Sequence, residues 1–462
     1  MKRVESAADA VNPSVIPPGS RIYVGGNAAT PQTLLNQLAS DTDIKDVDLY
    51  SVLLLGEETI MRKLFSAAAC KRITHRVIFN SAHTRDAVNS GRAKYQLWHL
   101  SEIPRNLRNH VKPNMVFVQV AGPDHGGNYS LGVTVEAVLA AIETAKDIGG
   151  TVIAEHNKRM PFVLGTTIPE NVIDYMVEAD YELPSSPVDP PDQKADRIGR
   201  LITELYINDG ATLQFGIGEV PDAVTNTLLD KKPKDLGVHS ELFSDGMRKL
   251  VEAGIVTNKI DKKEGERFSV ATVFLSPTPE GYRWLHYNSS VQSRPCDYTN
   301  SILTIARQPN MVSLNSAIGI DLHGNIWADS LQARQIYSGV GGQSDFIRGV
   351  QYSEDGVAII ALKAGTEDGI AKIVDKHPEG ITLTATAADP VIVVSEHGAI
   401  NLRGLSIGER AVGISYLADP EQRERLLKQV YDNPAFHKPK SFLLDGKYPR
   451  RFIPYKELFG DE

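Results

Sequence analysis

The 462-residue sequence has little cysteine, no long apolar run and no excess of positive charge. Its two cysteines, Cys70 and Cys296, are far apart and have no histidine pattern beside them, so we expect neither a disulfide framework nor a structural zinc site. Asp124 and His125 lie in one loop and His156 in another, and two histidines in separate loops without a second carboxylate at a fixed short spacing do not define a metal site, so we expect no metal ion. A thiolate mechanism would depend on Cys296 alone. Without a run of eighteen apolar residues, we expect no membrane partner.

The charge balance is acidic, with 57 Asp and Glu residues against 49 Lys and Arg residues. The two signs are interspersed, whereas a nucleic-acid-binding protein needs a basic face that neutralises phosphates. We expect no nucleic-acid partner, although a local basic pocket for one anionic ligand is compatible with this composition. Residues 1–20 hold acidic and polar side chains where a secretion signal needs an apolar stretch, which predicts a cytoplasmic protein.

Short β-branched runs alternate with helical patterns along the chain, which is typical of α/β units with parallel sheets. In the first half, residues 133–150 have the spacing of an amphipathic helix. A proline-rich stretch at 182–199 is the best linker signal, and the chain length also favours two domains. We therefore predict two related open α/β domains with mostly parallel sheets, at residues 1–205 and 206–462.

The α/β pattern restarts in the second half of the chain. Predicted strands lie at residues 211–216, 269–275, 311–316, 356–362 and 390–396. The last predicted helix spans residues 420–433 and begins after Asp419, a suitable N-cap residue. The strand and helix rhythm is similar in both halves, although no sequence repeat is present.

A first glycine segment lies where a predicted strand ends at Gly216 and Gly218 and a helix follows at once. Glycines let the backbone approach a ligand closely, and the free amides of a helix N-terminus attract anions. The segment lacks the third glycine of a dinucleotide fingerprint and the lysine of a phosphate loop. Taken alone, it is more often a tight turn.

A second glycine segment holds Gly339, Gly341 and Gly342 just before a predicted helix start. Backbone amides that point one way can stabilise an oxyanion, although a flexible turn is the commoner structure. Glu241 lies between another predicted strand and helix, near the strand ends where open α/β sheets bind ligands. A lone glutamate before a helix usually stabilises the helix dipole, so the residue type alone establishes no catalytic role.

A predicted buried strand ends at Ser395, Glu396 and His397, and Arg403 and Arg410 follow. Neighbouring side chains on a strand point to opposite faces, so these three groups cannot converge as a serine-hydrolase triad. Structural ion pairs between Glu396 and the two arginines are the stronger alternative.

In their order along the chain, these segments resemble the acetyl-CoA hydrolase/transferase family, in particular its short-chain branch of 4-hydroxybutyrate and butyrate CoA-transferases. The resemblance covers most of the chain and is carried by IPPGSRIYVGGNAATP, GPDHGGNYSLG, AEHNKRMPFVLG, DGATLQFGIGEVPDAV, HSELFSDGM, DLHGNI, SGVGGQSDFIRG and SEHGAINLRGLSIGERA. It implies two CoA-transferase-type domains with the nucleophile in the second. It also implies coenzyme A as a substrate without a permanently bound cofactor, and a homo-oligomer, either a dimer or a larger assembly.

By this resemblance, the nucleophile is Glu241 in HSELFSDGM, and the oxyanion-binding amide is that of Gly342. The family's asparagine after an Asp-Tyr pair is similar to Asn300, and the glutamate of its TE-x-G motif is similar to Glu396. The sequence departs from the family pattern at His397 and around Asn300, which affects the expected acyl group more than the reaction class. Substrate or CoA contacts are also expected at Gly216, Gly218, Gly339, Gly341 and Gly398.

The chemistry that the resemblance implies needs neither a base nor a metal, because a carboxylate with a reference pKa of about 4.3 is charged at neutral pH. Glu241 would attack the acyl-CoA thioester to give an acyl-glutamyl anhydride and CoA thiolate, which then form a glutamyl-CoA thioester. An incoming carboxylate repeats these steps in reverse, which gives ping-pong kinetics. Each step passes through an oxyanion that a backbone donor such as the Gly342 amide would stabilise.

The leading expectation is CoA transfer from a short-chain acyl-CoA to a small carboxylate such as acetate, butyrate or 4-hydroxybutyrate. Arg294, near the expected pocket, indicates a dicarboxylate such as succinate or itaconate as an alternative, although a structural salt bridge is the commoner role for such an arginine. A hydrolase, in which water intercepts the intermediate, is a second alternative. A third, from another class, is a non-catalytic metabolite-binding protein on the same scaffold.

Overall fold

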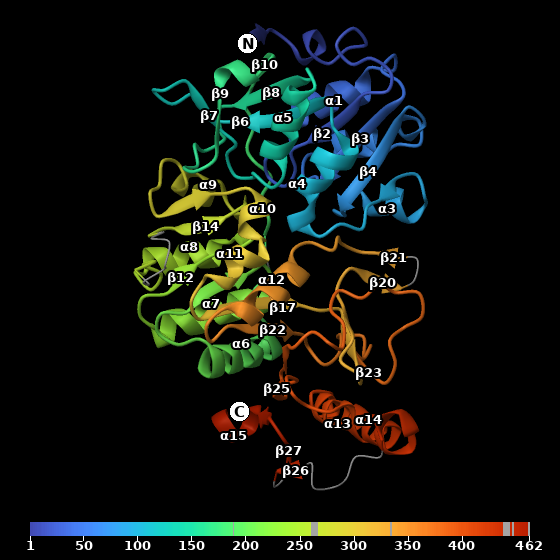
Figure 1. The fold of residues 1–462 in the computed structure, drawn as a ribbon, viewed down its shortest axis with the longest axis vertical. Helices are drawn as coiled ribbons and strands as arrows, with labels where there is room; N and C mark the ends of the chain where they lie inside the picture. The colour runs from blue at the N-terminus through green and yellow to red at the C-terminus, as the bar shows by residue number, and fades with distance from the viewer. Residues whose placement is uncertain (188, 260–266, 333–334, 438–443, 446–447, 461–462) are drawn as a thin grey trace.

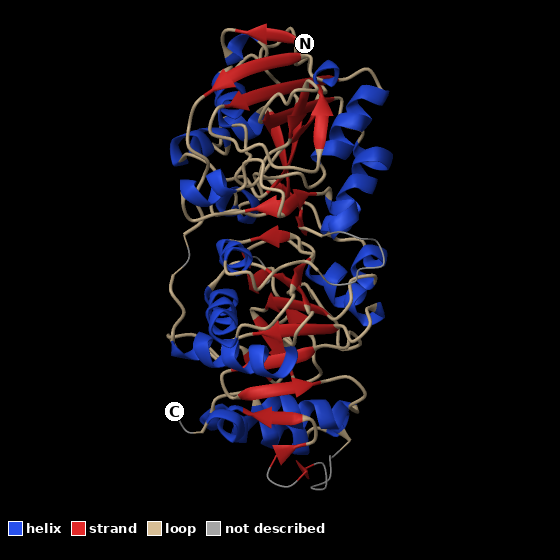
Figure 2. Ribbon diagram, turned by 90° about the vertical axis from the view of Figure 1, so that its left-hand side faces the viewer, coloured by secondary structure: helices blue, strands red, loops and turns tan. Residues whose placement is uncertain are grey.

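The computed structural model describes residues 1–187, 189–259, 267–332, 335–437, 444–445 and 448–460. The chain forms two α/β halves stacked along the long axis of the molecule, with the N-terminal half at the top of Figure 1. In the side view, strands form the middle layer of each half and helices flank them (Figure 2). The predicted α/β class with mostly parallel sheets is confirmed.

The first half is built on an eight-stranded sheet in the order β1-β10-β8-β6-β2-β3-β4-β5. Every neighbouring pair is parallel, as is usual where helices cover both faces of a sheet. The strands are β1 (Lys2–Val4), β10 (Tyr175–Ala179), β8 (Thr151–Asn157), β6 (Met115–Val120), β2 (Arg21–Val24), β3 (Val47–Val52), β4 (Ile73–Phe79) and β5 (Lys94–Tyr95). The α-helices are α1 (Gln32–Ser40), α2 (Glu58–Leu64), α3 (Arg85–Asn89), α4 (Ile103–Asn106) and α5 (Val138–Asp147).

Helix α5 is shorter than the helix predicted at residues 133–150. Glu136 has a φ of 40°, in the left-handed region, and the helix begins only after it. The N–H groups of Val135 and Glu136 instead donate to the carbonyl oxygen and the hydroxyl of Thr272 in the second half, both at 2.9 Å. Tertiary hydrogen bonds therefore override the helical pattern at this point.

The second half contains a seven-stranded sheet in the order β12-β11-β17-β22-β24-β25-β28. The first five strands pair in parallel, whereas β25 pairs antiparallel with both of its neighbours, β24 and β28. The strands are β12 (Gly237–Val238), β11 (Thr212–Phe215), β17 (Met311–Ser316), β22 (Val357–Ala361), β24 (Ile392–Ser395), β25 (Gly398–Asn401) and β28 (Phe452–Pro454). Four of the five predicted strands of this half are confirmed here, as β11, β17, β22 and β24.

The fifth predicted strand, at residues 269–275, is divided at Thr272. Its two parts pair with different partners: β14 (Ser269–Ala271) with β16 (Val291–Ser293), and β15 (Val273–Phe274) with β13 (Leu242–Phe243). At the division, the N–H groups of Thr272 and Val273 both donate to the carbonyl oxygen of Glu241, at 3.1 and 3.0 Å. The break therefore fixes the backbone of Glu241.

Helix α6 (Gln193–Tyr206) begins inside the stretch that was predicted to be a linker. Its N-cap residue Asp192 accepts a hydrogen bond from the Ala195 N–H at 2.8 Å, which satisfies one free amide of the first turn. The helix packs against α7 (Glu219–Lys231) and β24, in the second half. The domain boundary at 205/206 stays a prediction.

Helix α14 (Pro420–Asp432) agrees with the last predicted helix, but its cap does not. Asp419 makes no side-chain capping bond and contacts His397 instead. The remaining α-helices of this half are α8 (Asp245–Glu252), α9 (Pro279–Trp284), α10 (Cys296–Thr299), α11 (Ile302–Ala306), α12 (Gln343–Gly349), α13 (Ile407–Tyr416) and α15 (Tyr455–Phe459). Among the described residues, no helix has both the length and the apolar character of a membrane span.

The two halves share part of their apolar core. Phe162 and Val163 of the first half belong to the same buried cluster as Phe215 and Phe274 of the second. Burial of this much aromatic surface favours a fixed contact between the halves. Helix α10 lies at this junction, next to α4 (Figure 1).

Candidate active site

Glu241 lies at the carboxyl end of the second sheet, just after β12. The preceding backbone is held by hydrogen bonds from the His239 N–H to the Leu213 carbonyl at 3.2 Å and from the Ser240 N–H to the Val270 carbonyl at 3.0 Å. Together with the two amides that bind its carbonyl, these contacts fix the residue at the edge where open α/β sheets bind ligands.

Within the described part of the chain, two groups donate hydrogen bonds to the Glu241 carboxylate. Asn300 Nδ2 donates to Oε2 at 3.0 Å, and the backbone N–H of Gly342 donates to the same carboxylate. Burial raises the pKa of Glu241, while both hydrogen bonds favour the anion and oppose this increase. The side chain is partly exposed on one side, toward a pocket. The carboxylate is thus held by donors and still accessible to a reactant.

Both donors are placed by short helices. Asn300 follows α10, and its Oδ1 accepts a hydrogen bond from the Thr299 hydroxyl at 2.8 Å, which directs Nδ2 toward Glu241. Gly342 immediately precedes α12. A Cβ atom at position 342 would overlap both Asn300 Nδ2 and Glu241 Oε2, so a side chain there would displace the contact. The close approach of these two side chains to the backbone therefore favours glycine at this position.

A pocket of about 250 Å³ opens beside Glu241. Its lining combines the two glycine segments with side chains from both halves: Phe79, Gln214, Gly216, Ile217, Glu241, Leu242, Asn315, Ser316, Ala328, Ser338, Gly339, Val340, Gly341, Gly342 and Gln343. The first glycine segment, Glu241 and the second glycine segment, which are far apart in the sequence, therefore meet in one cavity with Phe79 of the first half.

The first half contributes directly to this cavity. Phe79, at the end of β4, occupies the space beside Gly339, where a Cβ atom would overlap its ring. The Ser101 hydroxyl and N–H donate to Asp345 of α12 at 2.7 and 3.2 Å. Burial raises the pKa of Asp345 to about 6, and the Ser101 hydrogen bonds oppose this. The glycine segment before α12 is therefore attached to the first half, and the site forms where the halves meet.

Gly218 lies just beyond the pocket lining, at the start of α7. Its φ of 126° is in the region that favours glycine, as a strand-to-helix turn requires. Lys363 pairs with Glu219 in the first turn of this helix and with Asp192 at 2.9 Å. Lys363 therefore lies beside this turn. A role for Gly218 in ligand binding stays a prediction.

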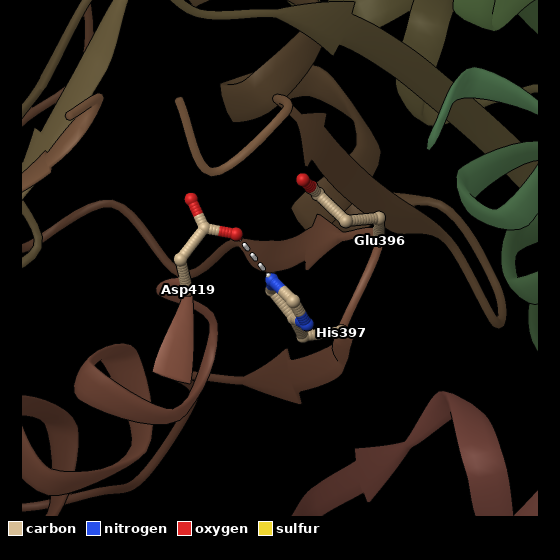
Figure 3. Close-up of side chains that lie close together, drawn as sticks. All are labelled: Glu396, His397 and Asp419. Carbon is tan, nitrogen blue, oxygen red and sulfur yellow. Dashed lines mark hydrogen bonds and ion pairs between the residues drawn. The ribbon is translucent and has the colours of Figure 1, made fainter. Parts of the chain in front are cut away.

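Glu396 lies in a different place from the Glu241 pocket, and its ion-pair partner was predicted wrongly. It is buried, accepts a hydrogen bond from the Ala364 N–H at 2.8 Å and pairs with Lys194 at 2.9 Å rather than with the two arginines. His397 Nε2 and Asp419 Oδ1 lie beside it, 2.9 Å apart (Figure 3). The three ligand atoms lie within 4.8 Å of one another, but Lys194 already neutralises Glu396.

A second pocket, of about 240 Å³, is lined by Glu396 and His397. Gly398 follows on β25, where a Cβ atom would meet the Phe452 ring and the Ile453 carbonyl of β28. Strand packing therefore explains this glycine. Substrate-binding roles for Glu396 and Gly398 stay predictions.

Two further sequence candidates lie near the junction of the halves. The Arg294 guanidinium donates to the Ser293 carbonyl at 3.1 Å and lies over the Phe268 ring, 5.5 Å from its centroid. Cys296 is fully buried, and its thiol donates to the Leu100 carbonyl at 3.2 Å. Burial raises the pKa of this thiol, so Cys296 is not a thiolate at neutral pH, and the thiolate mechanism is not supported.

Sequence reasoning missed the contributions of the first half, namely Phe79, Ser101 and Glu136. The Glu136 carboxyl is close enough to Glu241 for the two charges to interact. No local pattern marks these residues, since their relation to the site depends on how the halves dock. The one available signal was the acidic residue in the otherwise apolar run GVTVEAVLAA.

Comparisons with known proteins agree over most of the chain. The family model described as the acetyl-CoA hydrolase/transferase N-terminal domain matches residues 1–188, and the corresponding C-terminal domain model matches residues 278–430. The 4-hydroxybutyrate coenzyme A transferase of Clostridium kluyveri is 36% identical over 417 residues, which cover 89% of this chain and 93% of that protein.

Two further matches are similar in extent. The succinyl-CoA:acetate/propanoyl-CoA:succinate CoA transferase of Fasciola hepatica is 34% identical over 421 residues, which cover 90% of this chain and 85% of the relative. Among solved structures, RipA from Yersinia pestis superposes with a TM-score of 0.83 at 29% identity, covering 93% of this chain and 97% of that one.

Proposed function

Since the chain belongs to the acetyl-CoA hydrolase/transferase family and is an enzyme of acyl-CoA chemistry, we propose that it transfers CoA from a short-chain acyl-CoA to a small carboxylate. Glu241 is the proposed nucleophile. The observation that carries this proposal is the Glu241 carboxylate held by Asn300 Nδ2 and the Gly342 N–H at the wall of a pocket. Acetate, butyrate and 4-hydroxybutyrate are the proposed acceptors.

The proposed first half-reaction begins when a Glu241 oxygen attacks the thioester carbonyl carbon. The C–S bond breaks, CoA leaves as the thiolate, and an acyl-glutamyl anhydride remains. The thiolate then attacks the glutamyl carbonyl carbon, which releases the acyl group as a carboxylate and leaves glutamyl-CoA. The acceptor carboxylate reverses both steps, so the thioester bond energy is conserved and no proton is gained or lost overall.

Asn300 and Gly342 are proposed to stabilise the oxyanion that forms on the glutamyl carbon. Both already contact the resting carboxylate, and the same oxygen carries the developing charge when the thiolate attacks. Donors fixed in advance need no reorganisation during the reaction, and removing one typically costs ~10²- to 10³-fold in rate. A Cβ atom at position 342 would overlap Asn300 and Glu241, which supports a backbone donor rather than a side-chain donor at that point.

The CoA tail is proposed to bind along the carboxyl edge of the second sheet, past Gly216 and Gly218. Their turn leads into α7, and the first amides of a helix favour anionic groups. Lys363 beside the turn is paired with Glu219 and Asp192. Binding energy from a long, non-reacting tail can be used to orient the thioester against Glu241. Gly339 and Gly341 are proposed to contact the reacting end, because they line the pocket with Glu241.

A dicarboxylate acceptor, succinate or itaconate, is the second candidate. It is favoured by the Fasciola hepatica relative, whose name includes succinate, and by Arg294 near the junction of the halves. Arg294 is not among the residues that line the pocket beside Glu241, so the monocarboxylate proposal comes first. Hydrolysis by the same site is a further alternative, and a homo-oligomeric assembly stays a prediction.

The distinguishing experiment measures CoA release from acetyl-CoA or butyryl-CoA with and without an added carboxylate. Transfer predicts little release without an acceptor and formation of the new acyl-CoA with one. Release at the same rate in both cases would contradict transfer and favour hydrolysis. Comparing acetate, butyrate, 4-hydroxybutyrate, succinate and itaconate ranks the acceptors, and no activity with succinate or itaconate would remove the second candidate. An Arg294→Ala variant that keeps its dicarboxylate activity would remove the role of Arg294 in recognising such an acceptor.

A further inference from the structure

Glu136 is a second carboxyl group beside Glu241, buried at the junction of the halves. Its side chain is 1% exposed, and Asn27 Nδ2 donates to its Oε1. Its Oε2 atom has no hydrogen-bond partner among the residues that the structure describes. The residue adopts a left-handed backbone conformation just before α5, which is uncommon outside glycine and has a conformational cost. Such a placement calls for an explanation beyond packing.

A ring of hydrogen bonds connects the backbone N–H and carbonyl of Glu136 to Glu241 and so places its side chain beside the proposed nucleophile. On one side, the Glu136 N–H donates to Thr272 Oγ1 at 2.9 Å, and the Thr272 N–H donates to the Glu241 carbonyl at 3.1 Å. On the other side, the Cys296 N–H donates to the Glu136 carbonyl at 2.9 Å, and the Asn300 N–H donates to the Cys296 carbonyl at 3.0 Å. Asn300 Nδ2 closes the ring at Glu241. A displacement of Glu136 therefore reaches both the proposed nucleophile and its donor.

The charges around Glu136 favour a neutral carboxyl group. The ionisable groups that face it in the described part of the chain are Glu241, the Tyr23 phenol and the Cys296 thiol, none of which is a cation. Burial raises the pKa of Glu136 to about 8, the Glu241 charge adds to the increase, and the Asn27 hydrogen bond opposes it. Burial likewise raises the pKa of Tyr23 and of Cys296, so both stay neutral. Two adjacent buried anions without a cation would be strongly unfavourable.

We propose that Glu136 is a positioning residue whose buried carboxyl group keeps its proton while Glu241 is the anion, so that no second charge moves Glu241 away from Asn300. The inference rests on the proposed role of Glu241 as the nucleophile. Ionisation of Glu136 would place a second negative charge next to a site where an oxyanion forms. It would repel the Glu241 carboxylate from its donors and slow the first half-reaction.

The test measures the rate at which the enzyme forms its covalent adduct with acyl-CoA, from about pH 6 to about pH 9, where a single ionisation gives a characteristic change of slope. In the wild type, we expect the rate of adduct formation to fall as the pH rises past about 8. Well above that pH, the decrease should approach roughly tenfold per pH unit. Glu136→Gln resembles the protonated acid in shape and cannot ionise. The adduct rate of this variant should match that of the wild type within about threefold near pH 6.5, and it should not decrease at alkaline pH.

Two matched variants separate positioning from a general effect of buried glutamates. Glu155→Gln changes another buried glutamate, whose pKa burial raises to about 7, on β8 away from the site. Its pH profile should keep the alkaline decrease. Glu136→Ala removes the carboxyl group and should lower the adduct rate by roughly 10- to 100-fold at every pH. If Glu136→Ala does not fold, the comparison of the two Gln variants still decides the question.

The proposal is overturned if Glu136→Gln shows the same alkaline decrease as the wild type, or if it is as slow as a variant without the carboxyl group near neutral pH. Failure of the underlying function gives a different result. In that case the wild type forms no adduct on the peptide that contains Glu241 at any pH.

Discussion

The Nδ2 atom of Asn300 lies 3.0 Å from the Oε2 atom of Glu241. This contact joins the C-terminal end of α10 to the residue that precedes β13, and the Thr299 hydroxyl fixes the direction of the amide. The donor is therefore in place before a substrate arrives. The strength of this interaction in the proposed mechanism comes from its low-dielectric surroundings, which burial of Asn300 supplies.

Asn300→Ala should lower kcat by ~10²-fold or more, because it removes one of two donors to the reacting carboxyl group. KM for acyl-CoA should change little, since Asn300 contacts the reacting carboxyl group rather than the CoA tail. Steady-state kinetics with butyryl-CoA and acetate measure both constants. Asn315→Ala is the matched control, because Asn315 lines the pocket but bonds Ser313 and Gln214 instead of Glu241. Equal losses in the two variants would contradict a specific role for Asn300.

Gly342→Ala should nearly abolish turnover, because the new Cβ atom would overlap both Asn300 Nδ2 and Glu241 Oε2. We expect a decrease of ~10²-fold or more, comparable to removal of an oxyanion donor. Gly25→Ala is the control, since a Cβ atom there would be 3.7 Å from its nearest neighbours, an ordinary contact. Circular dichroism and turnover of both variants test the prediction, which fails if Gly342→Ala is folded and active.

Cys296→Ala should keep kcat within about fivefold of the wild type, because a buried, protonated thiol is neither a nucleophile nor a base. Its stability should fall by about 1 kcal/mol, since the variant loses buried packing and the hydrogen bond to Leu100. Denaturant unfolding and turnover measure the two effects separately, with Cys70→Ala as the control. A folded but inactive Cys296→Ala protein would restore the thiolate mechanism.

The stability of the protein should decrease between about pH 5 and about pH 8 because of Glu136. The pKa of Glu136 is raised to about 8 in the folded chain, so in this range the folded state binds more protons than the unfolded state, and the free energy of unfolding falls as the pH rises. With about 1.4 kcal/mol per pKa unit, the effect is at most roughly 5 kcal/mol. Urea unfolding of Glu136→Gln at several pH values should show a smaller decrease. An unchanged pH dependence would contradict this assignment.

Much of the architecture could be predicted from the sequence, because β22 and β24 are apolar β-branched runs, and β11 and β17 are short segments of apolar and small polar residues. Buried parallel strands have this pattern regardless of their neighbours. The errors arose where a tertiary contact replaced a local one. Helix α5 begins after Glu136 because Thr272 binds the preceding amides. Asp419 contacts His397 and leaves the first turn of α14 without a side-chain cap.

The site was predictable only in part. The resemblance to a family indicated Glu241, Asn300 and Gly342 one by one, and the structure brings these three residues into contact. The same reasoning placed Glu396 with them, although it lies beside another pocket. Glu136 could not be found in this way, because an acidic residue in an apolar helical pattern carries no information about what the other half of the chain places next to it.

Mass spectrometry of the peptide that contains Glu241, after incubation of the protein with acyl-CoA, tests the proposed nucleophile most directly. The mechanism predicts a CoA-sized adduct on this peptide that is absent in Glu241→Gln and disappears when acetate is added. An adduct on another residue, or normal turnover by folded Glu241→Gln, would contradict it.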